Sequence, residues 1–282
     1  MSDWDAWIGR EDRCSDRLDE SLAERWLGTF DLPMPHPAIM PQGIHFALCT
    51  PEAPTAKLGR DGHPQRDESE DSFLPPIPLP RRMWASSAID FIAPIVTGAV
   101  IQRTSRIASI TEKTGSSGSL AFVEIEHETK ANGTLSVRET QTLVYREAAV
   151  PDAPLSPPEP GKERFDKSVW DTVRALTPDT RLLFRYSALT FNAHRIHYDA
   201  PYARGEERYR GLVVHGPLIA SLLLQLAASE LGENKLQHFE FRGVSPAIAG
   251  DLLFLAMRDA GEGYELGAFA SDGRQVMAAK AA

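Results

Sequence analysis

Residues 217–231, PLIASLLLQLAASEL, are apolar on nearly every side of a helix, and this segment constrains the fold more than any other. A helix of fifteen residues is about 22 Å long, which is too short to cross a membrane. A helix without a polar face has to be buried on all sides. Pro217 suits the first turn of such a helix, and Gly232 suits its end. We therefore predict a central helix enclosed by the rest of its domain.

Segments in which apolar and polar residues alternate lie on both sides of this helix. Alternation predicts half-buried antiparallel strands. Asn132-Gly133 is a favoured pair for a tight hairpin turn, and residues 114–118 (TGSSG) are typical of a second turn. The predicted strands cover residues 96–110, 120–127 and 135–145 in the first half, and residues 236–242, 252–258, 264–270 and 275–279 in the second. An antiparallel sheet wrapped around a helix is the hot-dog fold, so we predict an α+β protein.

A short repeat links the two halves. Residues 93–98 (APIVTG) and 245–250 (SPAIAG) both place proline and glycine four positions apart, directly before a strand that begins a meander. This correspondence indicates an internal duplication. Residues 151–161 contain five prolines, which is typical of a linker. We therefore expect a domain at 1–150, a linker at 151–161 and a second domain at 162–282.

The first eighty residues are less regular. Residues 12–30 are typical of an amphipathic helix, with Ser21 and Glu24 at capping-box spacing and Leu22, Trp26 and Leu27 on one face. Residues 31–80 are rich in proline and include an acidic run, which predicts irregular structure apart from a short helical piece at 42–49.

Composition excludes several classes of protein. A net charge of −9 argues against binding to nucleic acid or to an anionic membrane surface. The 42% hydrophobic and 24% charged content is that of a globular protein. Two cysteines do not form a disulfide framework, and the acidic N-terminus lacks the apolar core of a secretory signal. We expect a soluble cytoplasmic protein without a membrane span.

Three of the eight histidines, His194, His197 and His215, lie just before the apolar helix. If Gly216 is the N-cap, the backbone amides of Gly216, Leu218 and Ile219 have no partner within the helix, and the helix dipole adds positive potential. This arrangement suits an anion, or an oxygen that becomes anionic during a reaction. A neutral histidine beside it can transfer protons near pH 7.

Other interpretations of the same residues remain. Gly216-Pro217 can simply begin a helix, and His215 can cap it or pack against it. His194 and His197 have the spacing of a metal pair that Asp199 or His215 would complete, but no Cys or Glu joins them at ligand spacing, so we expect no metal. Ser221 lacks the surroundings of a hydrolase nucleophile.

Two sequence segments resemble a known motif. TFNAHRIHYD at 190–199, followed by GLVVHGP at 211–217, resembles the motif of MaoC-like, R-specific enoyl-CoA hydratases. The similarity is greatest to the branch of hydroxyacyl-thioester dehydratase type 2, mesaconyl-CoA hydratase and itaconyl-CoA hydratase, and extends to WIGR at 7–10, LPRRMWA at 79–85 and EKTG at 112–115. The resemblance covers nearly the whole chain. It implies a double hot-dog fold whose first half has lost catalysis and whose second half retains it.

The resemblance also implies roles for individual residues. It places His197 at the catalytic histidine of the motif and Gly216 at its oxyanion-hole glycine. Asn192 stands where the wider family has aspartate, and a neutral amide cannot act as a base. Asn192 is therefore expected to hold water or to orient a neighbour. His194, where the wider motif has asparagine, is the candidate for the second acid or base.

The activity implied is the reversible addition of water to a short or dicarboxylic 2-enoyl-CoA, such as itaconyl-CoA or mesaconyl-CoA, without a further cofactor. Arg81 and Arg82 are candidates for a second substrate carboxylate, and Arg195 for that group or for the phosphates of coenzyme A. The full set of expected substrate contacts is Arg81, Arg82, Trp84, Arg195, Tyr198 and His215. A thioesterase or a non-catalytic acyl-CoA-binding protein on the same fold is the alternative. The two halves would pair like the subunits of a dimer, and a homodimer of the chain is also conceivable.

Overall fold

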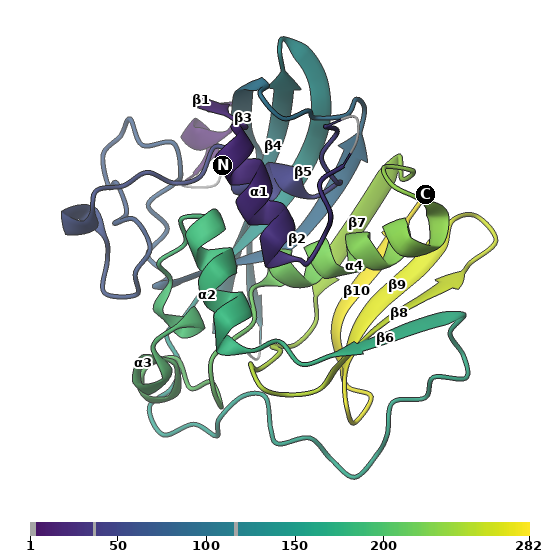
Figure 1. The fold of residues 1–282 in the computed structure, drawn as a ribbon. Coiled ribbons are helices and arrows are strands. Elements are labelled where there is room, and N and C mark those ends of the chain that lie inside the picture. Colours follow the sequence, from purple (N-terminus) through teal and green to yellow (C-terminus); the bar gives the residue numbers. More distant parts are fainter. Residues whose placement is uncertain (1–3, 36–37, 116–117) are drawn as a thin grey trace.

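A computed structural model describes residues 4–35, 38–115 and 118–282. Its ten strands form one continuous antiparallel sheet in the order β1-β3-β4-β5-β2-β7-β10-β9-β8-β6 (Figure 1). The first half contributes β1 (Glu11–Arg17), β2 (Arg81–Phe91), β3 (Val100–Gly115), β4 (Gly118–Ala131) and β5 (Thr134–Arg146). The second half contributes β6 (Thr172–Leu176), β7 (His238–Gly243), β8 (Leu253–Asp259), β9 (Tyr264–Ala270) and β10 (Gln275–Ala281).

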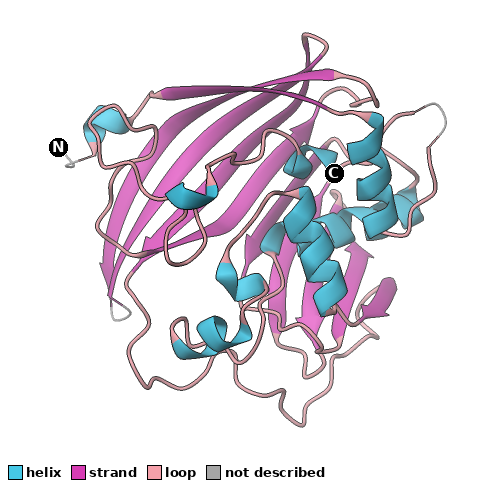
Figure 2. Cartoon of the chain, turned by 60° about the vertical axis from the view of Figure 1, so that its left-hand side comes forward, coloured by secondary structure: helices cyan, strands magenta, loops and turns pink. Residues whose placement is uncertain are grey.

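The two halves meet where β2 pairs with β7, from Ser86 opposite Arg242 to Asp90 opposite His238. The α-helices are α1 (Glu20–Thr29), α2 (Thr180–Leu189), α3 (Ala200–Gly205) and α4 (Gly216–Leu231). Short 3₁₀ helices are η1 (Asp5–Trp7), η2 (Ile44–Ala47), η3 (Thr55–Lys57) and η4 (Arg195–His197). The helices lie on one side of the sheet (Figure 2). The predicted α+β double hot-dog architecture is confirmed. None of the helices in the described residues is long and apolar enough to cross a membrane.

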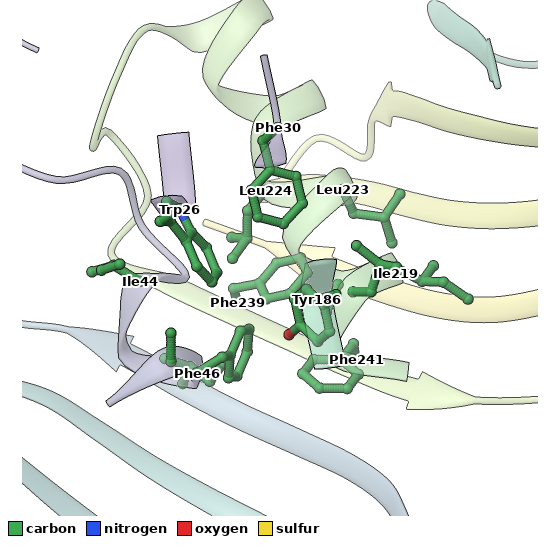
Figure 3. Close-up of a cluster of buried hydrophobic side chains, with 14 of the residues drawn as sticks. Trp26, Phe30, Ile44, Phe46, Tyr186, Ile219, Leu223, Leu224, Phe239 and Phe241 are labelled. Carbon is green, nitrogen blue, oxygen red and sulfur yellow. The ribbon is translucent and has the colours of Figure 1, made fainter. Parts of the chain in front are cut away.

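Helix α4 is the buried helix that its sequence predicts. Leu218, Ala220, Leu223, Leu226 and Ala227 are all 0% exposed, and the helix lies across the second-half strands (Figure 1). The surrounding core includes aromatic side chains from both halves, because α1 and α2 pack together through Trp26, Phe30 and Tyr186 (Figure 3). Burial of these large side chains is the main force that holds the helices on the sheet.

The predicted duplication is visible in backbone contacts. The Gly98 amide donates to the Leu18 carbonyl (2.6 Å), and the Gly250 amide donates to the Pro178 carbonyl (2.8 Å). Both glycines have positive φ, +88° and +92°, which glycine adopts without strain. The residue after each acceptor caps a helix: an oxygen of Asp19 accepts from Leu22 N for α1, and an oxygen of Asp179 accepts from Leu182 N for α2.

The halves differ at the central helix. In each half, one backbone hydrogen bond holds the segment just before the position of the central helix. These equivalent bonds run from Met40 N to Ile95 O and from Val214 N to Ala247 O, both at 2.9 Å. The second half then continues into α4 with 16 residues, whereas the first half has only η2 with four. Loops and short helices, in place of a long helix, therefore face the first-half strands (Figure 2).

Several local predictions were wrong. Residues 11–17 are strand β1, because their backbone pairs with β3, and helix α1 begins only at Glu20. Its cap is Asp19, and the Ser21 hydroxyl instead accepts a hydrogen bond from Arg25. Strands β2 and β6 were not predicted.

The expected short helix at 42–49 is η2, and the turn at Asn132-Gly133 is confirmed by positive φ at both residues. The turn expected at 114–118 includes residues 116 and 117, which lie outside the described residues. Residues 147–171, which include the predicted linker, contain neither helix nor strand.

Candidate active site

One cavity of about 1950 Å³ is lined by residues of both halves. It extends to the start of α4 and to the segment 191–197 that carries the histidines. Its walls include Asn192, His194, His197, His215 and Gly216. The structure thus brings together all of the residues that were predicted to be catalytic.

His197 is neutral and held in one orientation. It lies in η4, and its Nδ1 donates a hydrogen bond to the Val213 carbonyl at 2.7 Å. A carbonyl can only accept, so the proton of the neutral ring sits on Nδ1 and Nε2 keeps a free lone pair. Burial lowers the pKa of His197 to about 4, although the bond to Val213 acts in the opposite direction. The ring is therefore neutral at pH 7.

His215 supports this ring. The two imidazoles are stacked, with centroids 3.5 Å apart and an angle of 18° between their planes. The Ser187 hydroxyl is 2.8 Å from His215 Nε2, and burial keeps the pKa of His215 well below 6.5. His215 is also the N-cap residue of α4. It was predicted to pack, to cap or to contact substrate: it packs against His197 and lines the cavity, but its side chain makes no capping hydrogen bond.

Gly216 presents its backbone to the cavity. It is the first residue of α4 and not the predicted N-cap, because the Ile219 amide donates to the His215 carbonyl at 3.2 Å. The Ile219 amide is therefore used, and Pro217 has no amide hydrogen. The amides of Gly216 and Leu218 stay at the positive end of a 16-residue helix. A Cβ placed on Gly216 would meet no atom within 4 Å outside its neighbours and the helix's own backbone, so the side-chain position of Gly216 faces open space.

Asn192 is held by the backbone around it. Its side-chain oxygen accepts from the His194 amide (2.9 Å), and its own amide donates to the Ser187 carbonyl (2.9 Å). The side-chain amide of Asn192 therefore shapes the turn, and it cannot remove a proton. His194 is 9% exposed, and burial, followed by the charges of His63 and His197, lowers its pKa to about 2.

Asp61 and His63, which the sequence did not indicate, lie beside His194. The rings of His63 and His194 have centroids 4.0 Å apart, and Asp61 Oδ2 is 3.0 Å from His63 Nδ1. Burial alone would raise the pKa of Asp61, but the hydrogen bonds from His63 outweigh it and lower the pKa to about 2.

Within the described ranges, Asp61, His63 and His194 are the one group whose potential ligand atoms lie within 4.8 Å of one another. The metal pair weighed from the sequence is not assembled. His197 uses Nδ1 to bond Val213, and Asp199 is paired with Arg195.

The arginines predicted to bind substrate differ in their surroundings. Arg81 Nε is 2.6 Å from a Glu207 oxygen, and both side chains are nearly buried, so its charge is neutralised. Arg195 does not line the cavity: it bonds Asp199 through Nε and Nη2 and lies over the ring of Tyr202. Arg82 lines the cavity and has no ion pair within the part of the chain that is described.

The remaining predicted contacts, Trp84 and Tyr198, line the cavity. Trp84 Nε1 donates to the Ser87 hydroxyl at 2.8 Å, and Tyr198 is 55% exposed.

The first-half wall of the cavity includes His45, Arg103, His127 and Glu139. Together with Ser87 behind them we define these residues as the buried polar cluster; all but the half-buried Arg103 are buried. The Ser87 hydroxyl donates to Glu139 at 2.5 Å, and His45 Nε2 lies 3.9 Å from the other Glu139 oxygen. Burial raises the pKa of Glu139 to about 7 and lowers that of His45 to about 3. Arg103 donates to the Cys49 carbonyl at 2.6 Å.

Comparison with known proteins identifies relatives over the whole chain. The profile described as hydroxyacyl-thioester dehydratase type 2 matches residues 43–249. Mesaconyl-C(4)-CoA hydratase of Chloroflexus aurantiacus is 41% identical over 282 residues, covering 99% of this chain and 97% of the relative. Mitochondrial hydroxyacyl-thioester dehydratase type 2 of Schizosaccharomyces pombe is 30% identical over 248 residues, 78% of each chain.

Solved structures share the fold at low identity. A MaoC-like dehydratase superposes with a TM-score of 0.70 at 14% identity, covering 98% of both chains. A conserved hypothetical protein from Mycobacterium tuberculosis with a double hot-dog fold gives a TM-score of 0.55 at 14% identity, covering 97% of this chain and 95% of the other.

Proposed function

The chain belongs to the hydroxyacyl-thioester dehydratase type 2 family, and on this premise we propose that it reversibly adds water to a short 2-enoyl-CoA with a second carboxylate. It is an acyl-thioester hydro-lyase. One observation carries the proposal: neutral His197, whose Nε2 is unprotonated, and Gly216, whose amide has no hydrogen-bond partner among the described residues, line the same cavity.

The Gly216 amide is placed to polarise the substrate. A thioester carbonyl that accepts from this amide gains negative charge as the enolate forms, and the N-terminus of α4 stabilises that charge. One such donor is typically worth about 3 kcal/mol of transition-state stabilisation. This carbonyl binding also fixes the double bond relative to the histidines.

His197 activates the water. Its Nε2 accepts a proton from water as the oxygen bonds to the β-carbon, and the α-carbon then receives a proton. A positioned base contributes about 10²- to 10⁴-fold to the rate. The low pKa of His197 keeps Nε2 unprotonated across the neutral range. In the reverse direction, the protonated ring returns its proton to the departing hydroxyl.

We assign catalysis to the second half, at 162–282, and lining of the substrate to the first half, at 1–150. The Leu32 amide donates to the Leu27 carbonyl (2.9 Å), as the Asn192 amide does to Ser187 (2.9 Å). Leu32 therefore occupies the position equivalent to Asn192, and η2 replaces the long helix whose N-terminus would bind a carbonyl. The chemistry needs no cofactor beyond the coenzyme A thioester itself.

The walls of the cavity support a polar acyl group. Among the described residues of the buried polar cluster, His45 Nδ1, His45 Nε2 and Arg103 Nε are buried without a hydrogen-bond partner. An alkyl chain would leave them so, at a cost of about 1–3 kcal/mol each. Arg81 is neutralised by Glu207, so Arg82 is the member of the predicted arginine pair that is free to bind a carboxylate. The relative from Chloroflexus aurantiacus is named for a carboxylated substrate, mesaconyl-C(4)-CoA.

A panel of substrates tests the proposal. Crotonyl-, mesaconyl-, itaconyl- and long-chain enoyl-CoA are mixed with the enzyme, and loss of the enoyl-thioester absorbance is followed. We expect the highest kcat/KM with a carboxylated substrate. Release of free thiol without loss of the double bond would identify a thioesterase. The absence of both signals would identify a binding protein. Either result would refute the proposed function.

A variant tests the assignment of the carboxylate. Arg82→Gln should raise KM for the carboxylated substrate about 10-fold or more, since a charged hydrogen bond is worth about 1.5–3 kcal/mol. It should leave KM for crotonyl-CoA unchanged. An equal effect on both substrates would show that Arg82 does not bind the second carboxylate.

A further inference from the structure

Hydration moves two protons, one away from water and one onto the α-carbon. His197 accounts for the first, and Asn192, at the position where the wider family has an acid, cannot transfer the second. The inference that follows rests on the proposed function, because it concerns the group that completes this reaction. The structure brings such a group from the first half of the chain.

A tight turn of the first half docks onto the motif of the second half. The turn spans residues 59–63, and its Gly62 has φ of +90°. A Cβ on Gly62 would lie 1.9 Å from the Ala193 carbonyl oxygen, so only glycine allows the backbones to approach this closely. Arg195 secures the contact: its amide donates to the Asp61 carbonyl (2.8 Å), and Nη1 donates to the Arg60 carbonyl (2.9 Å).

The docked turn carries an oriented histidine. His63 Nδ1 is 3.0 Å from Asp61 Oδ2, and the His63 amide donates to Asp61 Oδ1 at 3.1 Å. A carboxylate on Nδ1 fixes the ring and stabilises an imidazolium when one forms, which leaves Nε2 for chemistry. The His63 side chain is 24% exposed, so it can exchange protons with solvent.

The same turn places His63 near the catalytic ring. The rings of His63 and His194 are tilted by 37° with centroids 4.0 Å apart, and His194 meets His197 in a T-shaped contact with centroids 5.4 Å apart. His63, His194 and His197 all line the one cavity. His194 itself is too buried to charge, so it serves as a spacer that holds the two outer rings apart.

We propose that His63 is a second catalytic histidine, delivered by the turn at 59–63 and oriented by Asp61, which protonates the α-carbon. In the forward direction His197 Nε2 accepts a proton from water, and the water oxygen bonds to the β-carbon. The π electrons of the double bond then take the proton of His63 Nε2 at the α-carbon. His63 ends neutral and His197 protonated, and solvent exchange restores both. Asp61 is a positioning residue.

The central experiment measures kcat against pH for the wild type and for His63→Gln. A general acid works only in its protonated form, so the proposal predicts a wild-type rate that falls at high pH and a profile that changes when residue 63 is replaced. His63→Gln should lower kcat about 10²- to 10⁴-fold and abolish this alkaline limb. Asp61→Asn, which loosens the ring without removing it, should give a smaller loss of kcat.

A matched control exists where β2 pairs with β7. His238 makes the same contact with Asp90, Nδ1 to Oδ1 at 2.8 Å, but does not line the cavity. His238→Gln should leave kcat and the pH profile unchanged. Added imidazole should restore activity to His63→Gly, and the rescue of His197→Ala should not show the same pH dependence. If the role of His63 were purely structural, imidazole would not restore activity to His63→Gly.

The outcomes are decisive in both directions. If the wild type hydrates enoyl-CoA and His63→Gln retains its kcat and its alkaline limb, this proposal is wrong and the proposed function stands. If the wild type hydrates none of the substrates, the proposed function fails and this proposal fails with it. Loss of wild-type activity on dialysis against a chelator, with recovery on adding zinc, would show that Asp61, His63 and His194 bind a metal and would also overturn it.

Discussion

Glu139 offers a quantitative test of the cavity's electrostatics. This carboxyl is 7% exposed, and burial raises its pKa from an ordinary 4.5 to about 7, against the opposing effects of Ser87 and Arg103. Between these pH values the folded protein holds a proton that the unfolded chain has released. Stability therefore falls as the pH rises from 4.5 to 7 and stays low above 7.

The size of the effect follows from this difference. Each pH unit corresponds to about 1.4 kcal/mol, so ionised Glu139 costs the folded protein about 3 kcal/mol at pH 8. Glu139→Gln keeps an oxygen that can accept from Ser87 and removes the charge. We expect the variant to be more stable than the wild type by about 3 kcal/mol at pH 8 and equally stable near pH 4.5.

Urea unfolding, followed by circular dichroism at pH 4.5, 6 and 8, measures this difference. Glu124 is the matched control, because it accepts from the Ser109 hydroxyl at 2.6 Å as Glu139 does from Ser87, but it is exposed. Glu124→Gln should show no such dependence on pH. A Glu139→Gln variant that is less stable at pH 8, or that differs from the wild type equally at every pH, would refute the reasoning.

Three further predictions concern the site. Gly62→Ala should lower kcat by about 10²-fold with the fold retained in circular dichroism, since a shift of about 1 Å in a catalytic group has that effect; an unchanged kcat would contradict the docking of the turn. Ser187→Ala leaves the buried Nε2 of His215 unpaired, so the free energy of unfolding should fall by about 1–3 kcal/mol in urea titrations. Burial lowers the pKa of His197 to about 4, so kcat/KM should lose activity on the acid side near pH 4; a midpoint near 6.5 would show that His197 is not the base.

The sequence predicted those elements whose own pattern of apolar and polar residues shows which face is buried. Helix α4 is apolar on all sides, so its position follows from composition alone. The long strands β3 to β5 alternate in polarity because one of their faces is buried. Strand β1, EDRCSDR, has no such pattern and is a strand only because β3 supplies its hydrogen bonds.

The site was predictable where its residues are close in sequence. His197 and Gly216 are 19 positions apart, in two short segments that resemble the motif of a known family. The position of the Asp61–His63 pair depends on a contact between Gly62 and Ala193, which are 131 positions apart. A local sequence pattern cannot predict such a contact. Glu139 did leave a signal: it follows Leu135 and Val137 at the inward-facing positions of a predicted strand, where an acid is unexpected.

The pairing of β2 with β7 has a consequence for the enzyme in dilute solution. Two separate subunits have to associate before a site shared between them exists, and they come apart when their concentration falls below the dissociation constant. Here the five residue pairs from Ser86–Arg242 to Asp90–His238 join partners that belong to one polypeptide. His63 and His197 therefore stay together at any dilution, and the specific activity should be constant from micromolar to picomolar enzyme.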